Sequence, residues 1–128
     1  MPGGNRRAKP PYESVIRGQW PRAEMGAVMG EHLGAQVAQA VSRALAEAME
    51  EQEMSANALA KASDVNRQAI AHVLAGKVWP DLLTVASLEG ALGVPLWPNH
   101  TAWPRDDRGR PCDPDICPAA VPAATPDP

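Results

Sequence analysis

The 128-residue sequence contains no phenylalanine, a single tyrosine and no apolar run long enough to cross a bilayer. Its basic N-terminus, MPGGNRRAKPPYE, lacks the apolar segment of a secretory signal peptide. We therefore expect a cytoplasmic protein that does not contact a membrane. There is no strand signal. Nothing resembles a set of nucleophile, base and orienting group, and the three histidines lie far apart, so we expect no enzyme activity and no cofactor.

Cysteine is also scarce, with only Cys112 and Cys117 in the chain. Thiols in a cytoplasmic protein are usually free, and we expect the same here. A C-x4-C pair is only half of a zinc site and His100 adds little to it, so we expect no metal. A redox-sensitive pair is the alternative, although no other feature supports it. The sequence leaves the role of the two cysteines open.

Proline and glycine divide the chain. Residues 99–128 contain seven prolines, which exclude a regular helix there. Residues 1–21 are rich in proline, glycine and arginine, a composition typical of disorder. We therefore expect a flexible basic tail over residues 1–21, one domain over residues 22–98 and a proline-rich tail over residues 99–128.

Between the tails, the spacing of apolar residues predicts an all-α fold, a small bundle of four to five helices. The predicted helices cover residues 35–53, 55–62, 66–75 and 81–92, with a fifth over 22–33 left open. We expect Trp79 and Trp97 to flank the core. The predicted core consists of Val41, Leu45, Leu59, Ala60, Val65, Ile70, Val73, Leu82, Val85, Leu88, Leu92 and Val94.

Small residues recur every fourth position over residues 25–49, beside an apolar series with the same spacing. Small residues spaced in this way let helix backbones approach closely. One interpretation is a long N-terminal helix or helical hairpin used for self-association. The other is a loop before the 35–53 helix, because each glycine costs about 1 kcal/mol relative to alanine inside a helix.

Residues 55–76 have the pattern of two short helices joined by a tight turn. Ser55 can cap the first helix and Asn66 the second, because their side-chain oxygens accept from orphan backbone N–H groups. Asp64 lies where the chain turns, and aspartate tolerates the left-handed backbone better than most residues. Gly76 is placed to end the second helix. This is the spacing of a helix-turn-helix, whose second helix lies in the DNA major groove.

The stretch resembles the Cro/repressor-like (Xre) helix-turn-helix family. Pro80–Asp81 and the apolar residues after it are similar to that family's fourth and fifth elements, so the resemblance covers about residues 37–97. It implies a lambda-repressor-like bundle that binds double-stranded DNA.

The sequence departs from this family in three places. Ala56 replaces a common glutamine, which removes one contact to DNA, and Asp64 replaces the usual turn glycine. Met49 and Leu74 stand where many relatives have an Arg–Glu ion pair. An apolar pair in place of an ionic one is often neutral or stabilising, so we expect these two side chains to be buried against each other.

The first two turns of the 66–75 helix project the residues that would read DNA. Arginine pairs with guanine O6 and N7, and glutamine with adenine N6 and N7. The resemblance assigns base contacts to Arg67, Gln68, Ala71 and His72, and the candidate phosphate contacts are Asn57, Lys61, Asn66 and Lys77. We expect a minor-groove arm of Arg6, Arg7 and Lys9. The alternative is that the helix face is merely polar and solvated.

The net charge of −3 is low for a DNA-binding protein, so its distribution matters. Residues 1–30 carry a net charge of +3, residues 31–98 of −4 and residues 99–128 of −2. Few phosphate contacts imply modest non-specific affinity.

We predict a sequence-specific transcription regulator, most simply a bacterial repressor, that binds DNA as a homodimer and is nucleoid-associated when bound. The alternative is a protein-interaction module, antitoxin-like or phage-type, whose helices bind a protein partner while DNA binding is secondary or lost. The acidic domain and the small-residue pattern favour that alternative. The sequence does not define the operator, the effector, the sign of regulation or the dimer interface.

Overall fold

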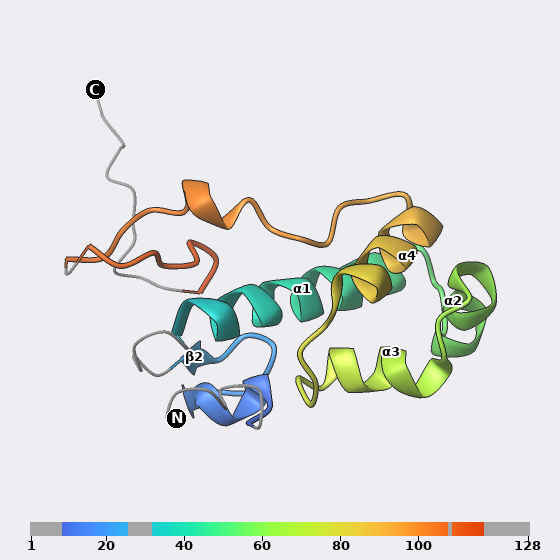
Figure 1. Cartoon of the computed structure of the whole chain (residues 1–128), viewed down its shortest axis with the longest axis horizontal. Helices are drawn as coiled ribbons and strands as arrows, with labels where there is room; N and C mark the ends of the chain where they lie inside the picture. The colour runs from blue at the N-terminus through green and yellow to red at the C-terminus, as the bar shows by residue number, and fades with distance from the viewer. Residues whose placement is uncertain (1–8, 26–31, 108, 117–128) are drawn as a thin grey trace.

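The computed structural model describes residues 9–25, 32–107 and 109–116, and its centre is a bundle of helices around one apolar core (Figure 1). The expected bundle of α-helices is confirmed, and the predicted helix boundaries agree to within a few residues. The four α-helices of the described residues are α1 (His32–Glu51), α2 (Ala56–Ser63), α3 (Arg67–Leu74) and α4 (Leu82–Leu92).

The core lies where these four helices meet. It consists of Val41, Leu45, Ala48, Leu59, Ile70, Val73, Val85, Leu88, Leu92 and Leu96. Ala60, Val65 and Val94 are partly buried against it, in agreement with the prediction. Met49 and Leu74 also pack against this core, and the contact between the two stays a prediction.

One predicted core residue is wrong. Leu82 is 76% exposed, and Leu83 beside it is 78% exposed. Leu82 precedes the buried residues Val85 and Leu88 at helical spacing. It lies in the first turn of α4, however, and this turn extends beyond the core.

The N-terminal segment, residues 9–25, differs most from the sequence prediction. It contains a 3-10 turn, η2 (Pro11–Ser14), and two short antiparallel strands, β1 (Val15–Arg17) and β2 (Glu24–Met25). Of these elements, η2 and β2 contact α1. The helix over 22–33, which the sequence left open, is not formed at residues 22–25, and residues 26–31 lie outside the described part. Because Met25 is in a strand, a single helix from residue 25 to 49 is also wrong.

A buried glutamine explains how such short strands are held. The Gln39 side chain of α1 accepts from the Ala23 backbone N–H at 2.8 Å and donates to the Ala23 carbonyl at 3.0 Å. Both residues are almost completely buried. The side-chain amide thus satisfies the backbone groups that the two-stranded sheet leaves unpaired.

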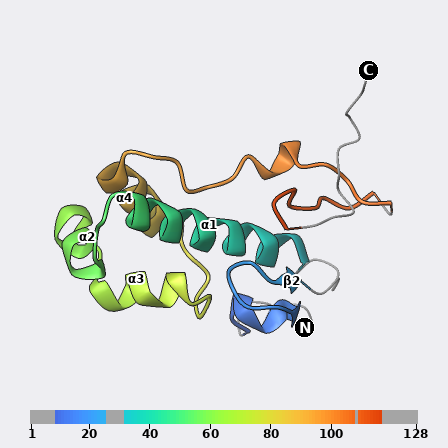
Figure 2. The ribbon, with the colours of Figure 1, turned by 180° about the vertical axis from the view of Figure 1, so that it is seen from behind.

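The C-terminal segment, residues 99–116, begins with a 3-10 turn, η3 (His100–Ala102), and then folds back along α1. Arg43 of α1 donates to the buried Asp113 at 2.8 Å, and the Gln36 side chain accepts from the Asp113 backbone N–H at 2.7 Å. In Figures 1 and 2 the two terminal segments lie on opposite sides of α1. Four polar residues of α1 are therefore buried rather than solvated: Gln36, Gln39, Ser42 and Arg43.

Candidate nucleic-acid interface

The helix-turn-helix is built by the caps that the sequence predicts. The Ser55 side chain accepts from the Ala58 backbone N–H at 3.1 Å and begins α2. Asp64 ends α2 in the left-handed conformation, with φ of 63°. The Asn66 side chain accepts from the Gln68 backbone N–H at 2.7 Å and begins α3. Residues 64–66 therefore form the turn, and the Asn66 side chain fixes the start of α3.

The C-terminal end of α3 is fixed by a glycine with φ of 70°, Gly76. The Lys77 backbone N–H donates to the His72 carbonyl at 3.0 Å, and the Gly76 N–H donates to the Val73 carbonyl at 3.2 Å. These two bonds form a Schellman motif, which satisfies carbonyls that the helix end would leave free. Gly76 thus ends the helix in the way the sequence predicts.

The N-terminal segment covers this end of α3, which the sequence did not predict. A Cβ atom at Gly76 would lie 2.5 Å from Cε2 of the Trp20 ring. The Tyr12 backbone N–H donates to the Gly76 carbonyl at 3.0 Å. Two residues far away in the sequence therefore hold the last turn of the candidate recognition helix.

α3 divides cleanly into an inner and an outer face. Ile70 and Val73 are buried in the core, and the Ser42 hydroxyl of α1 donates to the Val73 carbonyl at 2.5 Å. Arg67, Gln68 and Ala71 are exposed, and His72 is half-buried. The four predicted base-reading residues thus come from one side of α3, which the bundle leaves uncovered.

The predicted phosphate contacts are exposed as well. Asn57, Lys61, Asn66 and Lys77 all lie on the surface of the helix-turn-helix. Asn66 uses its side-chain oxygen as the cap of α3, which leaves its NH₂ group as the donor.

The basic side chains differ in whether they are paired. In the described part of the chain, Lys61, Arg67 and Lys77 form no ion pair. Two basic residues of the N-terminal segment do, since Arg17 pairs with Glu24 at 3.0 Å and Arg22 pairs with Glu47 at 2.7 Å. Lys61, Arg67 and Lys77 thus give the helix-turn-helix three positive charges that no carboxylate of the described residues pairs.

The Asp81 carboxylate brings a negative charge near this surface. The Asp81 carboxylate caps α4 by accepting from the Thr84 backbone N–H at 2.7 Å. That bond, together with one from the Thr84 side chain, lowers the pKa of Asp81 below its ordinary value. Asp81 therefore stays ionised to lower pH than a free aspartate, four residues after Lys77.

The predicted arm is only partly within the described residues. Arg6 and Arg7 lie outside them. The Lys9 carbonyl accepts from Nε1 of Trp79 at 2.9 Å, and Trp79 follows α3 by a few residues. The chain therefore enters the domain beside the C-terminal end of α3.

The prediction of free thiols is wrong for Cys112, which is buried and disulfide-bonded. Cys117, the other cysteine of the sequence, lies outside the described residues. The prediction rested on the reducing state of the cytoplasm, not on local structure, and could not detect the fold that buries Cys112. Within the described ranges, no three His, Cys, Asp or Glu side chains are grouped to hold a metal ion.

The fold and the exposed face of α3 define a DNA-binding domain of helix-turn-helix type. Residues 45–96 match the family model HTH_3, described as helix-turn-helix, which extends from the middle of α1 to Leu96. The chain therefore contains a Cro/C1-type (Xre-family) helix-turn-helix domain, a class that is typically not enzymatic. No curated protein was found to match the chain. No helix in the described part of the protein has the length and apolar character needed to span a membrane.

Proposed function

We propose that this protein is a sequence-specific transcription regulator that reads the DNA major groove with α3. The observation that supports this most directly is the outer face of α3, where Arg67, Gln68 and Ala71 are exposed on a helix capped at both ends. In a helix-turn-helix domain this face is the one that enters the groove. We further propose that the protein is most simply a repressor, acts in the cytoplasm as a homodimer and is nucleoid-associated when bound.

Each side chain of the outer face suits a different base edge. Arg67 can donate two bonds to guanine, and Gln68 can pair with adenine through its amide. Ala71 is small enough to contact a thymine methyl, and His72 completes the face. Asn57, Lys61, Asn66 and Lys77 would bind phosphates, which fixes the register of the domain on the duplex.

The arm of Arg6, Arg7 and Lys9 would supply additional attraction to DNA. Its attachment point supports this proposal, because the Lys9 carbonyl is hydrogen-bonded to Trp79 beside the end of α3. Arg6 is three residues from Lys9, so it can reach no further than about 11 Å along the chain from that point. An arm held there begins beside Trp79, which is two residues after Lys77 in the chain.

The direct test is selection of bound fragments from a pool of random DNA by the full-length protein at fixed salt. We expect enrichment of a short motif, repeated with two-fold symmetry if the protein binds as a dimer. Recovery of fragments without any shared motif would contradict sequence-specific reading.

Deleting residues 1–8 tests the arm while keeping the bond between Lys9 and Trp79. We expect weaker binding to all sequences, because Arg6 and Arg7 are lost. The slope of log affinity against log salt should become shallower by about 0.9 for each phosphate contact removed. The measurement is a salt titration of the full-length and shortened proteins on one duplex. Two equal slopes would show that the arm does not touch phosphate.

A second candidate function is favoured by one specific observation. Leu82 and Leu83 are adjacent, apolar and more than three-quarters exposed, and such a pair suits contact with another protein chain. In this alternative the protein is an antitoxin-like or phage-type partner protein and DNA binding is secondary. The random-DNA selection separates the two, since a shared motif is expected only from the first.

A further inference from the structure

The solvent side of α4 has the reverse of the usual surface pattern. A surface helix of a globular protein buries its apolar residues and exposes its polar ones. In α4, all of whose residues the structure describes, the polar residues Thr84, Ser87 and Glu89 are half-buried instead. The exposed residues of α4 are Leu82, Leu83, Ala86 and Gly90. α4 therefore turns no polar face to solvent, which is typical of a helix that is covered on both sides.

The four exposed residues form one uncharged stripe along the helix, which we call the α4 stripe. At about 100° per residue they fall within roughly 100° of one another around the helix axis, away from the core residues Val85 and Leu88. Leu82 and Leu83, at the N-terminal end, are 76% and 78% exposed. At the other end, a Cβ atom at Gly90 would meet no atom within 4 Å. The stripe thus has two large side chains at one end and open space at the other.

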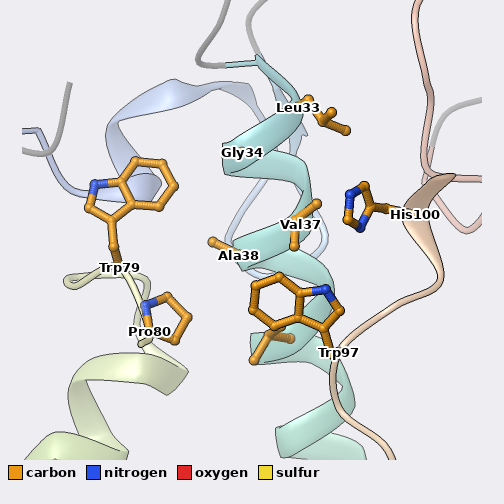
Figure 3. Close-up of a pocket in the computed structure, with 9 residues that line it drawn as sticks. Leu33, Gly34, Val37, Ala38, Trp79, Pro80, Trp97 and His100 are labelled. Atoms are coloured by element: carbon orange, nitrogen blue, oxygen red, sulfur yellow. The ribbon is translucent and has the colours of Figure 1, made fainter. Parts of the chain in front are cut away.

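The turn that carries the two leucines is held in place. Trp79 and Pro80, which come just before α4, lie beside the face of α1 that carries Gly34 (Figure 3). The Asp81 side chain then caps α4 by accepting from the Thr84 backbone N–H at 2.7 Å. The leucines are therefore presented on a capped turn, so little conformational freedom is lost when a partner covers them.

A second copy of α4, running antiparallel, matches the stripe in shape. A two-fold axis at Ala86 places Leu82 of each copy opposite Gly90 of the other, because both residues are four positions from Ala86. Such a contact is isologous, which means that the same surface serves on both copies. The large end of each stripe thus meets the open end of the other, and the fit occurs twice.

Charge favours the same arrangement. A parallel pair of α4 helices would place the two exposed Asp81 carboxylates side by side. In the antiparallel pair each Asp81 is five residues from the axis, so the two lie about 15 Å apart along the helices. This separation exceeds the Debye length of about 8 Å at physiological salt. Two copies that each carry a net charge of −3 can therefore meet at this uncharged stripe without bringing like charges together.

The length of α4 indicates how strong this contact is. Two helices of 11 residues bury on the order of 800–1,000 Å² in total when they pack together, which is the size of weak and transient interfaces. We therefore expect monomers and dimers to exchange in solution. In Figures 1 and 2, α3 lies along the lower edge of the bundle with α4 above it. None of the residues proposed to contact DNA belongs to the stripe, so the dimer contact and the DNA contacts use different residues.

We propose that the α4 stripe is the contact between two copies of this chain, which pack α4 against α4 antiparallel about a two-fold axis at Ala86. The proposal rests on the proposed function in one respect, the homodimer, and does not require that α3 reads DNA. It assigns to a second copy the two leucines that the second candidate function would assign to a different protein.

Sedimentation velocity of the full-length protein without DNA tests the contact. We expect the sedimentation coefficient to rise from that of a monomer to that of a dimer between micromolar and millimolar concentration. Leu83→Glu should weaken the dimer by roughly tenfold or more, because each dimer would desolvate the new charge twice. Leu83 is exposed in the monomer, so this variant keeps its fold. Ile16→Glu is the matched control, since Ile16 is 61% exposed on β1 and should leave the dissociation constant unchanged.

Chemical cross-linking tests the register. Because Ala86 lies on the two-fold axis, Ala86→Cys should give a covalent dimer with a short bismaleimide. The matched control is Ala62→Cys, another exposed alanine but on α2, which should stay monomeric. The wild type, treated in the same way, accounts for any reaction of Cys112 and Cys117.

Three results would overturn the proposal. The first is a wild type that stays monomeric up to millimolar concentration, which would leave the stripe to a different protein. The others are a dimer that Leu83→Glu does not weaken and equal cross-linking of the two cysteine variants. These measurements contain no DNA, so their failure is distinct from failure of the random-DNA selection. A dimer that selects no DNA motif would support the α4 contact while contradicting sequence-specific reading.

Discussion

Replacing Asp113 with alanine is expected to lower the free energy of unfolding by about 3–5 kcal/mol, because it removes the buried charge partner of a buried arginine. The side chains of Arg43 and Asp113 are 7% and 2% exposed and meet at 2.8 Å. Arg43 is already short of one bond, since its Nη1 has no partner among the described residues. The measurement is chemical denaturation under oxidising conditions, which keep the disulfide at Cys112 intact.

Asp115→Ala is the matched control for this prediction. Asp115 also faces Arg43, at 3.4 Å, but its side chain is 71% exposed. An exposed partner of this kind contributes up to about 1 kcal/mol to the free energy of unfolding, so Asp115→Ala should cost no more than that. The double variant Arg43→Met/Asp113→Leu should recover most of the loss, because it removes both buried charges together. Equal effects of Asp113→Ala and Asp115→Ala would show that the C-terminal segment is not anchored by the buried pair.

Gly76→Ala should lower the free energy of unfolding by about 2–5 kcal/mol, for two reasons that add. Its φ of 70° is unfavourable for alanine, and its Cβ would lie 2.5 Å from the ring of Trp20. The ring would have to move, which would release the contact that covers the end of α3. Thermal or chemical denaturation measures the loss, and binding to a selected DNA site reports whether α3 is still presented correctly.

Gly93→Ala separates these two reasons. Gly93 ends α4 with φ of 72°, but a Cβ there would meet no atom within 4 Å. Replacing it with alanine should lower the free energy of unfolding by about 1–2 kcal/mol, which is the cost of the left-handed backbone alone. Adding Trp20→Ala to Gly76→Ala should cost less than the two single changes together. If Gly76→Ala and Gly93→Ala were equally destabilising, the packing of Trp20 on α3 would be contradicted.

The helix-turn-helix was predictable because its determinants are local. Ser55, Asp64, Asn66 and Gly76 each act on backbone groups within a few residues, so their spacing alone places the caps and the turn. The apolar face of α3 repeats with the helical period for the same reason. These signals also placed Arg67 in the first turn of α3, directly after the Asn66 cap.

The terminal segments were not predictable because their partners are distant in sequence. The backbone N–H of Ala23 pairs with the side chain of Gln39. The carboxylate of Asp113 pairs with Arg43, a residue 70 positions earlier. Polar side chains that bond to a backbone or to one another leave no periodic signal. Strands of two or three residues are likewise too short to alternate visibly. The order of residues 9–25 and the burial of the polar side of α1 therefore required the structure.

The central claim is that α3 reads bases, and the most direct measurement compares Arg67→Ala with Lys77→Ala. Each variant is titrated, at one salt concentration, against the selected duplex and a panel of duplexes with single base-pair changes. We predict that Arg67→Ala reduces the binding free energy for the selected duplex by about 1–3 kcal/mol and removes the preference at one base pair only. Lys77→Ala should weaken binding to every duplex alike. If Arg67→Ala lowered the affinity for all duplexes equally, the base-reading role of α3 would be contradicted.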